Sequence, residues 1–253
     1  MKYKLLALDI DETITTEGAS TVPSPVLEML QKASKEIVIT FVTARAINRF
    51  KLFLDTLGLP PGYHVIENGA KVLDPQGTVE FDLSIPHDEV QALLDVTREH
   101  ATEWGLLSDE HWRDDLDTFD VDHTITGLSF TCISEERAQK LTSAVRTLPH
   151  KYAWYIGKHW DNPDEWKGVL LFHKNATKGN GMRYIQEKLG IHKDETIAVG
   201  DGATDVSMFD SAGLKIAMAN AVPEMIEKAD YVAPSVREDG IIEVIQKYVI
   251  SSS

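Results

Sequence analysis

Short apolar runs that alternate with amphipathic segments constrain the fold of this chain more than any other feature. Residues 37–42 (IVITFV) form one such run, which is typical of a parallel strand buried on both faces. Residues 46–57 follow with an amphipathic pattern and stop at Gly58, a usual C-terminal cap of a helix. This rhythm predicts an α/β protein with a doubly wound, Rossmann-like, mostly parallel sheet.

The same strand–helix rhythm occupies both ends of the chain. In the first part we expect strands at residues 4–9, 37–42 and 64–66, helices at 23–33 and 46–57, and a hairpin turn at 74–77. In the last part we expect strands at 195–199, 214–218 and 231–233, and helices at 177–189, 204–212, 223–228 and 240–248. The two ends are therefore predicted to form one sheet domain.

The middle of the chain follows a different pattern. The predicted elements are helices at 88–104 and 135–148, and strands at 124–133, 151–159 and 167–173. Strands joined by short turns mark an α+β module, unlike the repeats on either side. We therefore predict an α/β core formed by residues 1–81 and 174–253, interrupted by an inserted α+β domain at residues 82–173.

The charge of the chain limits its partners. A formal net charge of −15 argues against nucleic acid or an anionic membrane, since both need basic patches. No apolar stretch reaches the roughly 20 residues that span a bilayer, and the N-terminus does not resemble a signal peptide, so the cytoplasm is the expected location. Cys132, the single cysteine, is predicted to be a core thiol. An anionic ligand would need a few placed cations or a metal ion.

A pair of aspartates follows the first apolar run. Residues 5–8 (LLAL) lead into residues 9–13 (DIDET). Residues two apart on an extended backbone point the same way, so Asp9 and Asp11 can face one pocket. Taken alone, such a pair is more often a pair of surface turn residues.

Other predicted strands also end in polar residues, and in a doubly wound sheet these ends line the ligand site. The strand at 37–42 leads to Thr43 and Arg45, and Lys178 begins the helix that follows the inserted domain. A hydroxyl, a guanidinium and an ammonium are therefore expected at the same edge as the two aspartates.

A third group of acids follows the strand at 195–199. Residues 200–205 (GDGATD) contain Asp201 and Asp205, which can face one point from the start of a helix. Each could be a helix-capping acid, but their joint placement with the other strand ends favours a site. Hard carboxylate oxygens suit Mg²⁺, which binds one or two carboxylates together with substrate phosphate and water.

Taken together, the segments at 9–13, 42–45, 178 and 200–205 resemble the four ordered motifs of the haloacid dehalogenase (HAD) superfamily. Three further segments resemble motifs of its subfamily IIB, the Cof-like and sucrose-phosphatase-like phosphatases. They are residues 67–70 (ENGA), 218–221 (MANA) and 238–240 (EDG). The resemblance covers the whole chain. It implies that residues 82–173 are a C2B-type cap domain that sets substrate specificity.

The resemblance also implies roles for individual residues. Asp9 would be the nucleophile, and Asp11 would act as acid and then base. Phosphate binding is implied for Thr43, Lys178, Arg45 and Asn68. Mg²⁺ is the implied cofactor, with Asp9, Asp11 (through its carbonyl), Asp201 and Asp205 around it and Thr204 and Asn220 behind them. We expect Asp9 to be ionised against the metal, and Asp11 to lie where its protonated form is favoured.

Two residues depart from the motifs of the superfamily. Glu12 replaces a common glycine, which suggests a backbone that tolerates a side chain at this point. Thr204 replaces a common asparagine before the last aspartate. A change in metal affinity is the expected consequence of the second departure.

The cap is expected to choose the substrate. The polar and aromatic candidates on its strands and turns are His123, Thr126, Tyr155, His159, Trp160 and Lys167. Trp154 and Trp166 are expected to pack within the cap. The acidic stretch at 108–122 lacks the order of a calcium loop and is predicted to be a solvated loop.

The predicted function is Mg²⁺-dependent hydrolysis of a small phosphomonoester, a sugar phosphate or a phosphoglycolate-like metabolite, through an aspartyl-phosphate. One alternative is a phosphomutase of the same superfamily, phosphomannomutase-like, since the same aspartate pair serves both reactions. Another is a non-catalytic metabolite-binding protein on this fold. The expected assembly is a monomer or a weak homodimer.

Overall fold

The computed structural model describes residues 2–16, 18–108, 111–113, 124–149, 152–158 and 166–250. The chain divides into two compact units. The first consists of Met1–Arg45, Arg49–Phe81 and Thr177–Ser253, and the second of Ala46–Asn48 and Asp82–Ala176. Among the helices that the structure describes, none combines the length and the apolar composition needed to cross a membrane.

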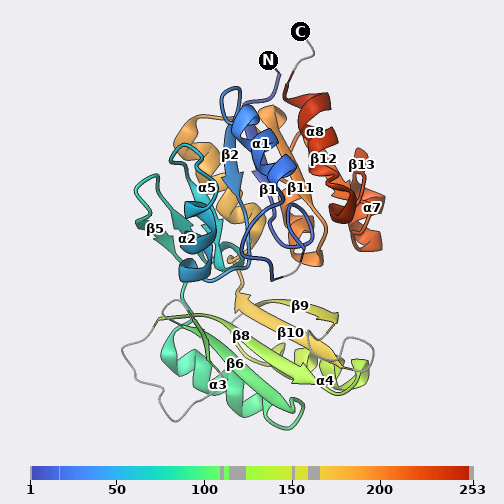
Figure 1. Ribbon diagram of the computed structural model, residues 1–253. Helices are drawn as coiled ribbons and strands as arrows, with labels where there is room; N and C mark the ends of the chain where they lie inside the picture. Colours follow the sequence, from blue (N-terminus) through green and yellow to red (C-terminus); the bar gives the residue numbers. More distant parts are fainter. Residues whose placement is uncertain are drawn as a thin grey trace. The chain divides into compact units, whose positions relative to one another are not determined.

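A five-stranded parallel sheet forms the centre of the first unit (Figure 1). Its strands, in spatial order, are β13 (Tyr231–Ala233), β12 (Leu214–Met218), β11 (Thr196–Gly200), β1 (Leu5–Leu8) and β2 (Val38–Phe41). In β1 every residue is fully buried, as the apolar composition of a central parallel strand requires. The predicted doubly wound, mostly parallel α/β fold is confirmed.

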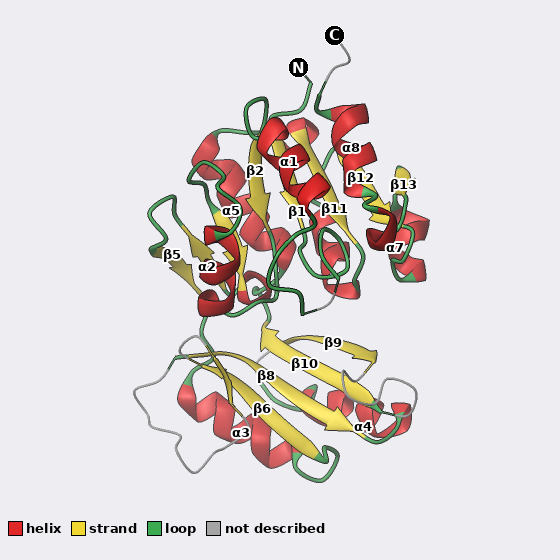
Figure 2. Cartoon of the chain, in the orientation of Figure 1, coloured by secondary structure: helices red, strands yellow, loops and turns green. Residues whose placement is uncertain are grey.

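Helices cover this sheet (Figure 2). They are α1 (Ser24–Ala33), α2 (Ile47–Asp55), α5 (Lys178–Leu189), α6 (Val206–Phe209), α7 (Pro223–Lys228) and α8 (Ile241–Tyr248). Met182 of α5, Met208 of α6 and Met225 of α7 pack into one buried cluster with small sheet residues such as Ala7 and Ala198. Small strand residues let these three helices approach the sheet closely, so water is excluded from the face of the sheet that they cover.

A hairpin extends the first unit beyond the sheet. Strands β3 (His64–Ile66), β4 (Lys71–Leu73) and β5 (Val79–Asp82) form a separate three-stranded sheet. The predicted turn at residues 74–77 is confirmed, because the Gly77 amide donates to the Asp74 carbonyl (2.9 Å). The Asp74 carboxylate accepts from the amides of Gln76 (2.9 Å) and Thr78 (2.8 Å), as turn aspartates commonly do.

The second unit is an antiparallel sheet with two helices. The spatial order is β7 (His111–Arg113), β6 (Glu103–Ser108), β8 (Ile125–Cys132), β10 (Lys167–His173) and β9 (Tyr152–Lys158). The helices are α3 (His87–Thr97) and α4 (Glu135–Val145). Cys132 is fully buried, and burial raises the pKa of its thiol to about 11, which fits the predicted core thiol.

The predicted helix at residues 88–104 is wrong in its last part. Helix α3 ends at Thr97, whose hydroxyl donates to the Leu93 carbonyl (2.7 Å). Glu103 and Trp104 belong to β6 and pair with Thr131 and Phe130 of β8. Trp104 packs against the same core as α3, so the apolar period continues past the point where the backbone changes from helix to strand.

His64 is a buried histidine at the start of β3. Its ring stacks on Phe41 (centroids 5.4 Å apart) and lies against Phe50 (5.1 Å). The Phe41 amide donates to its Nδ1 (3.2 Å), so the neutral ring carries its proton on Nε2. Burial lowers the pKa of His64 from its ordinary value of 6.5 to about 3.

We expect the substitution His64→Asn to reduce the acid sensitivity of the fold. The folded-state pKa lies below the unfolded one, so stability is fully present above pH 6.5 and is lost as the pH falls toward 3. The loss is about 1.4 kcal/mol per pH unit, or roughly 2 kcal/mol between pH 6.5 and 5. Asparagine can still accept from the Phe41 amide but does not titrate. Urea unfolding at pH 7 and pH 5 measures the effect, and equal losses in both proteins would contradict it.

Candidate active site

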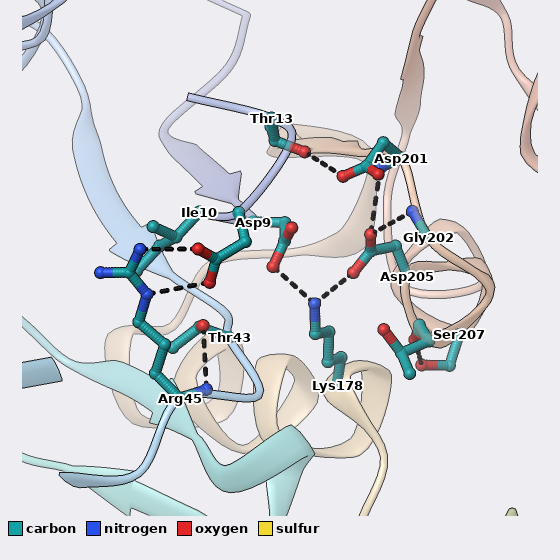
Figure 3. A network of polar contacts seen from close by, with 12 residues as sticks. Asp9, Ile10, Thr13, Thr43, Arg45, Lys178, Asp201, Gly202, Asp205 and Ser207 are labelled. Atoms are coloured by element: carbon teal, nitrogen blue, oxygen red, sulfur yellow. Dashed lines mark hydrogen bonds and ion pairs between the residues drawn. The ribbon is translucent and has the colours of Figure 1, made fainter. Parts of the chain in front are cut away.

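The carboxyl ends of β1 and β11 lie side by side because the two strands are parallel neighbours, with Leu8 opposite Val199. Asp9 follows β1 and Asp201 follows β11. Helix α5 presents Lys178 in its first turn, where the Thr177 hydroxyl caps the helix by accepting from the Asn180 amide (3.2 Å). The structure therefore brings residues from distant parts of the sequence to one edge of the sheet (Figure 3).

Lys178 bridges two aspartates in this cluster. Its Nζ lies 2.6 Å from Asp9 Oδ1 and 2.5 Å from Asp205 Oδ1. Lys178 is 2% exposed, Asp9 6% and Asp205 1%, so the three charges lie away from bulk water. Burial by itself would lower the pKa of Lys178, but the two carboxylates outweigh burial and raise that pKa. The ammonium is therefore charged at physiological pH.

The three aspartates form a cluster that could hold a metal ion. Asp9, Asp201 and Asp205 each offer a carboxylate oxygen, and these oxygens lie within 4.8 Å of one another. Burial, followed by repulsion from Asp205, raises the pKa of Asp9 well above its usual range and that of Asp201 to about 7. One lysine does not balance three acids, so without a further cation the protonated form of Asp9 is favoured. That Asp9 is ionised against a metal ion stays a prediction. A divalent cation would supply the missing positive charge, and the all-oxygen donor set fits Mg²⁺.

Asp205 is less suited than its neighbours to direct metal contact. Its Oδ1 accepts from Lys178, and its Oδ2 accepts from the amides of Asp201 (3.0 Å) and Gly202 (2.8 Å). Asp201 is instead held at one oxygen, Oδ1, by the hydroxyl of Thr13 (2.8 Å). The sequence reasoning missed this role of Thr13, although the residue closes the DIDET segment.

Asp11 and Arg45 form a separate pair. Arg45 donates from Nε to Asp11 Oδ2 (2.9 Å) and from Nη2 to Asp11 Oδ1 (2.7 Å), in a bidentate arrangement. Nη2 also donates to the Ala19 carbonyl (2.8 Å), and the guanidinium lies over the ring of Phe53 (4.7 Å). Asp9 and Asp11 therefore have different partners, and the guanidinium faces the second aspartate.

The backbone at Glu12 is not what the sequence suggested. Glu12 has φ +59°, in the left-handed region that favours glycine. The glutamate thus occupies a conformation that favours glycine, and the expectation of a backbone that readily tolerates a side chain at this point is wrong. Asn220 helps to hold this turn, because its Nδ2 donates to the Glu12 carbonyl (2.8 Å) and its Oδ1 accepts from the Val236 amide (2.9 Å).

Three further residues of the first unit were predicted at the site: Thr43, Asn68 and Thr204. Thr43 is buried, and its Oγ1 accepts from the Arg45 amide (3.1 Å), which leaves the hydroxyl able to donate to a ligand. The backbone N–H of Asn68 donates to the backbone carbonyl of Thr43 (3.0 Å). Thr204 lies in a 3₁₀ turn at Ala203–Asp205, and its carbonyl accepts from the Ser207 hydroxyl (3.1 Å).

The predicted specificity residues belong to the second unit. Thr126 is buried in β8, and Tyr155 of β9 is half-buried with its ring 6.4 Å from that of Phe172. Lys167 of β10 lies 3.7 Å from a carboxylate oxygen of Glu135. The other three candidates, together with most of the acidic stretch at 108–122, lie outside the described residues: His123, His159 and Trp160.

Two tryptophans of this unit, Trp154 and Trp166, were expected to pack within the cap. The guanidinium of Arg146 lies over the ring of Trp154 (5.0 Å). Trp166 precedes β10 and is partly buried. Their packing role within the unit stays a prediction.

Fold and site together define an α/β enzyme with an acidic, lysine-bridged cluster at the carboxyl edge of its parallel sheet. Residues 6–115 and 113–245 match the haloacid dehalogenase-like hydrolase family, and the chain belongs to that family. The predicted superfamily and the prediction of an enzyme are therefore confirmed.

Two relatives illustrate the similarity. The 5-amino-6-(5-phospho-D-ribitylamino)uracil phosphatase YcsE of Bacillus subtilis is 22% identical over 248 residues, covering 98% of this chain and 96% of the relative. The phosphoglycolate phosphatase of Staphylothermus marinus is 27% identical over 246 residues, covering 96% of this chain and 97% of the relative.

Solved structures share the fold over nearly the whole chain. A haloacid dehalogenase-like hydrolase from B. subtilis superposes with a TM-score of 0.81 at 19% identity, covering 98% of this chain and all (100%) of the other. The HAD subclass IIB sugar phosphatase BT4131 superposes with a TM-score of 0.74 at 24% identity, covering 96% and 97% of the two chains. The chain therefore shares its fold with this subclass IIB sugar phosphatase.

Proposed function

We propose that this protein is a divalent-metal-dependent phosphatase that hydrolyses a small phosphomonoester through an aspartyl-phosphate. The observation that carries the proposal is the buried ammonium of Lys178 between Asp9 and Asp205. A fixed cation beside a carboxylate, at the edge where a parallel sheet binds ligands, is suited to a phosphoryl group. The phosphatases among the relatives, which include a phosphoglycolate phosphatase, support a small phosphorylated substrate.

In the first step, a carboxylate oxygen of Asp9 attacks phosphorus in line with the ester bond. The bond between phosphorus and the leaving oxygen breaks, and Asp11 gives that oxygen a proton. In the second step, Asp11 takes a proton from water, whose oxygen attacks the phosphorus. This releases inorganic phosphate and restores the Asp9 carboxylate.

Lys178 and Thr43 would stabilise the phosphoryl oxygens during both steps, by charge and by an O–H donor respectively. For Arg45 we propose a positioning role, because both of its described carboxylate contacts are with Asp11. This role differs from the phosphate contact that the resemblance implies. Holding Asp11 at both oxygens fixes its orientation before the substrate binds. One of the two contacts with Arg45 has to open before Asp11 can carry the proton that it gives to the leaving oxygen.

Asp9 and Asp201 would hold the metal ion, with the carbonyl of Asp11 as a further ligand, and Asp205 would orient Lys178 and the turn at residues 201–202. When bound, a divalent cation would neutralise negative charge on the phosphoryl group. We also propose that the second unit serves as the specificity cap, with Thr126, Tyr155 and Lys167 among the residues that meet the substrate.

Removal of divalent metal is expected to abolish phosphate release. Protein treated with a chelator and then dialysed should hydrolyse p-nitrophenyl phosphate at least about 100-fold more slowly than protein supplied with Mg²⁺. Adding Mg²⁺ should restore the rate, while the circular dichroism spectrum stays unchanged. Inorganic phosphate release from a panel of sugar and carboxylate phosphomonoesters then measures the substrate range. Full activity after chelation, or no hydrolysis of any ester with Mg²⁺, would contradict the proposal.

A further inference from the structure

His64 is a buried histidine whose second ring nitrogen has no hydrogen-bonding partner. The residue is 3% exposed. Its Nδ1 accepts from the Phe41 amide, so the proton of the neutral ring lies on Nε2. Among the residues that the structure describes, none accepts a hydrogen bond from this Nε2. Buried donors without an acceptor are rare in folded proteins, and such a group implies a ligand or a water in the working protein.

An open cavity of about 550 Å³ lies beside this ring, and His64 is part of its lining. The cavity lies at the amino end of the parallel sheet, since it is also lined by Lys4, which precedes β1, and by Val38, which begins β2. The candidate active site lies at the opposite, carboxyl end of the same strands. The volume is within the range of small-molecule sites. The apolar part of the lining consists of Ile37, Val38, Ile39, Leu59, Pro60 and Pro61.

The cavity forms because the segment before β3 cannot pair with the start of β2. Further along the two strands they do meet, since the Thr43 amide donates to the Val65 carbonyl (2.9 Å). Pro60 and Pro61 have no N–H with which to extend this pairing toward the amino end of β2. The edge of β2 therefore faces the cavity at this end.

The carbonyl oxygen of Ile39 faces the same part of the cavity as the imidazole. The Val38 amide donates to the Lys4 carbonyl (3.0 Å), so the Ile39 carbonyl, one residue further along the strand, points away from β1. A Cβ atom placed on Gly62 would lie 3.5 Å from this oxygen and 3.8 Å from Nε2 of His64. Both are ordinary van der Waals distances, so a ligand atom fits at this point. It would lie next to one donor and one acceptor.

The charges at the rim of the cavity balance one another. Lys35 and Glu36 line the rim, and both are exposed. Lys4 pairs with Glu195 (2.5 Å). Two ammonium groups and two carboxylates leave no excess of either sign among these four residues. A neutral ligand is therefore favoured over an ion, because an ion is attracted by an excess of opposite charge.

We propose that this cavity is a second ligand site, which binds a small neutral molecule that has an apolar body and a carboxamide group. The amide carbonyl accepts from His64 Nε2, and the amide N–H donates to the Ile39 carbonyl, so that both protein groups are paired. A ketone of the same shape leaves the Ile39 carbonyl without a donor, and a carboxylate brings negative charge against it. The apolar body lies against Leu59, Pro60 and Pro61. The inference goes beyond the proposed phosphatase function and does not depend on it.

The test compares three probes of one shape, namely benzamide, acetophenone and benzoate. Acetophenone replaces the NH₂ group of benzamide with a methyl group, and benzoate replaces the amide with a carboxylate. Dissociation constants come from NMR titrations that follow the backbone amide of residue 62 and the Nε2 signal of His64. In the wild type we expect benzamide to bind at least about tenfold more tightly than either of the other probes.

Gly62→Ala should block the site without disturbing the fold. Its methyl group would occupy the space beside Nε2 and the Ile39 carbonyl at ordinary contact distances, so the affinity for benzamide should fall at least about tenfold. Gly157→Ala is the matched control, because Gly157 is exposed in β9 and a Cβ atom there meets nothing within 4 Å. The control should bind benzamide as the wild type does, and thermal unfolding checks that both variants fold.

A second variant, His64→Asn, tests the donor itself. It keeps an acceptor for the Phe41 amide, but its side chain is too short to place a donor where Nε2 lies, so benzamide should bind about tenfold more weakly. Equal affinities for the three probes would mean that the cavity takes apolar rings without using His64. No saturation with benzamide would mean that a water alone pairs with Nε2, and a preference for benzoate would mean an anion site. Each of these results overturns the proposal, as does wild-type affinity in Gly62→Ala.

Discussion

Asp9→Asn is expected to reduce phosphate release by at least about 10⁴-fold, because an amide cannot act as the nucleophile in the proposed first step. The fold should survive the change. Asp9 is one of three clustered acids, and burial raises its pKa well above its usual range. Replacing it with a neutral isostere removes repulsion from Asp205, while the contact between Lys178 and Asp205 stays. In a chelating buffer the free energy of unfolding should therefore be unchanged or higher.

Phosphate release assays and urea unfolding measure these two effects separately. Asp74→Asn is a suitable control, since Asp74 accepts backbone hydrogen bonds in the β4–β5 turn and an asparagine can do the same. This control should keep wild-type activity. Residual activity of Asp9→Asn above about 1% would rule out Asp9 as the only nucleophile.

Lys178→Met should damage both activity and stability. The ammonium pairs with two carboxylates at 2.6 and 2.5 Å, and its side chain is only 3% exposed. Removing one partner of a buried charged network leaves the others unpaired, at a cost of about 3–5 kcal/mol. Loss of a fixed cation beside the phosphoryl group should lower kcat by about 10³-fold. A metal ion can offset part of the lost positive charge, so Mg²⁺ should raise the unfolding midpoint of this variant more than that of the wild type.

Lys228→Met is the matched control for stability. Lys228 also pairs with a carboxylate, Glu224, at 2.7 Å, but the two side chains are 50% and 56% exposed. Exposed ion pairs contribute little, so the urea midpoint of the control should stay close to that of the wild type. If both lysine variants unfolded at the wild-type midpoint, the buried network would not hold the site together as described.

The strand ends could be predicted because they depend on local pattern. Apolar runs of four to six residues specify buried parallel strands, and the residues after such strands must lie at one edge of the sheet. This reasoning places Asp9, Thr43 and Asp201 at the same edge without any knowledge of contacts. The end of α3 could not be predicted in this way, because Trp104 satisfies the helical apolar period while pairing in β6.

The ion-pair and hydrogen-bond partners of the site residues could not be predicted from the sequence. Lys178 meets Asp9 across 169 positions of sequence, and Arg45 meets Asp11 across 34. Nothing local indicates that the guanidinium would contact the second aspartate. The positive φ of Glu12 could not be predicted either. A glutamate in place of a common glycine usually indicates a backbone outside the left-handed region. In the structure, Asn220 holds the turn in the glycine conformation regardless.

The sequence by itself thus determined which chemical groups reach the site: carboxylates, a lysine and a hydroxyl, in an order set by the strands that carry them. Tertiary structure alone decided how those groups pair. It placed Lys178 between two acids, Arg45 on Asp11 and Thr13 on Asp201. The physical reason is that periodicity and turn chemistry act over a few residues, whereas hydrogen bonds and ion pairs depend on ångström distances between segments far apart in the chain.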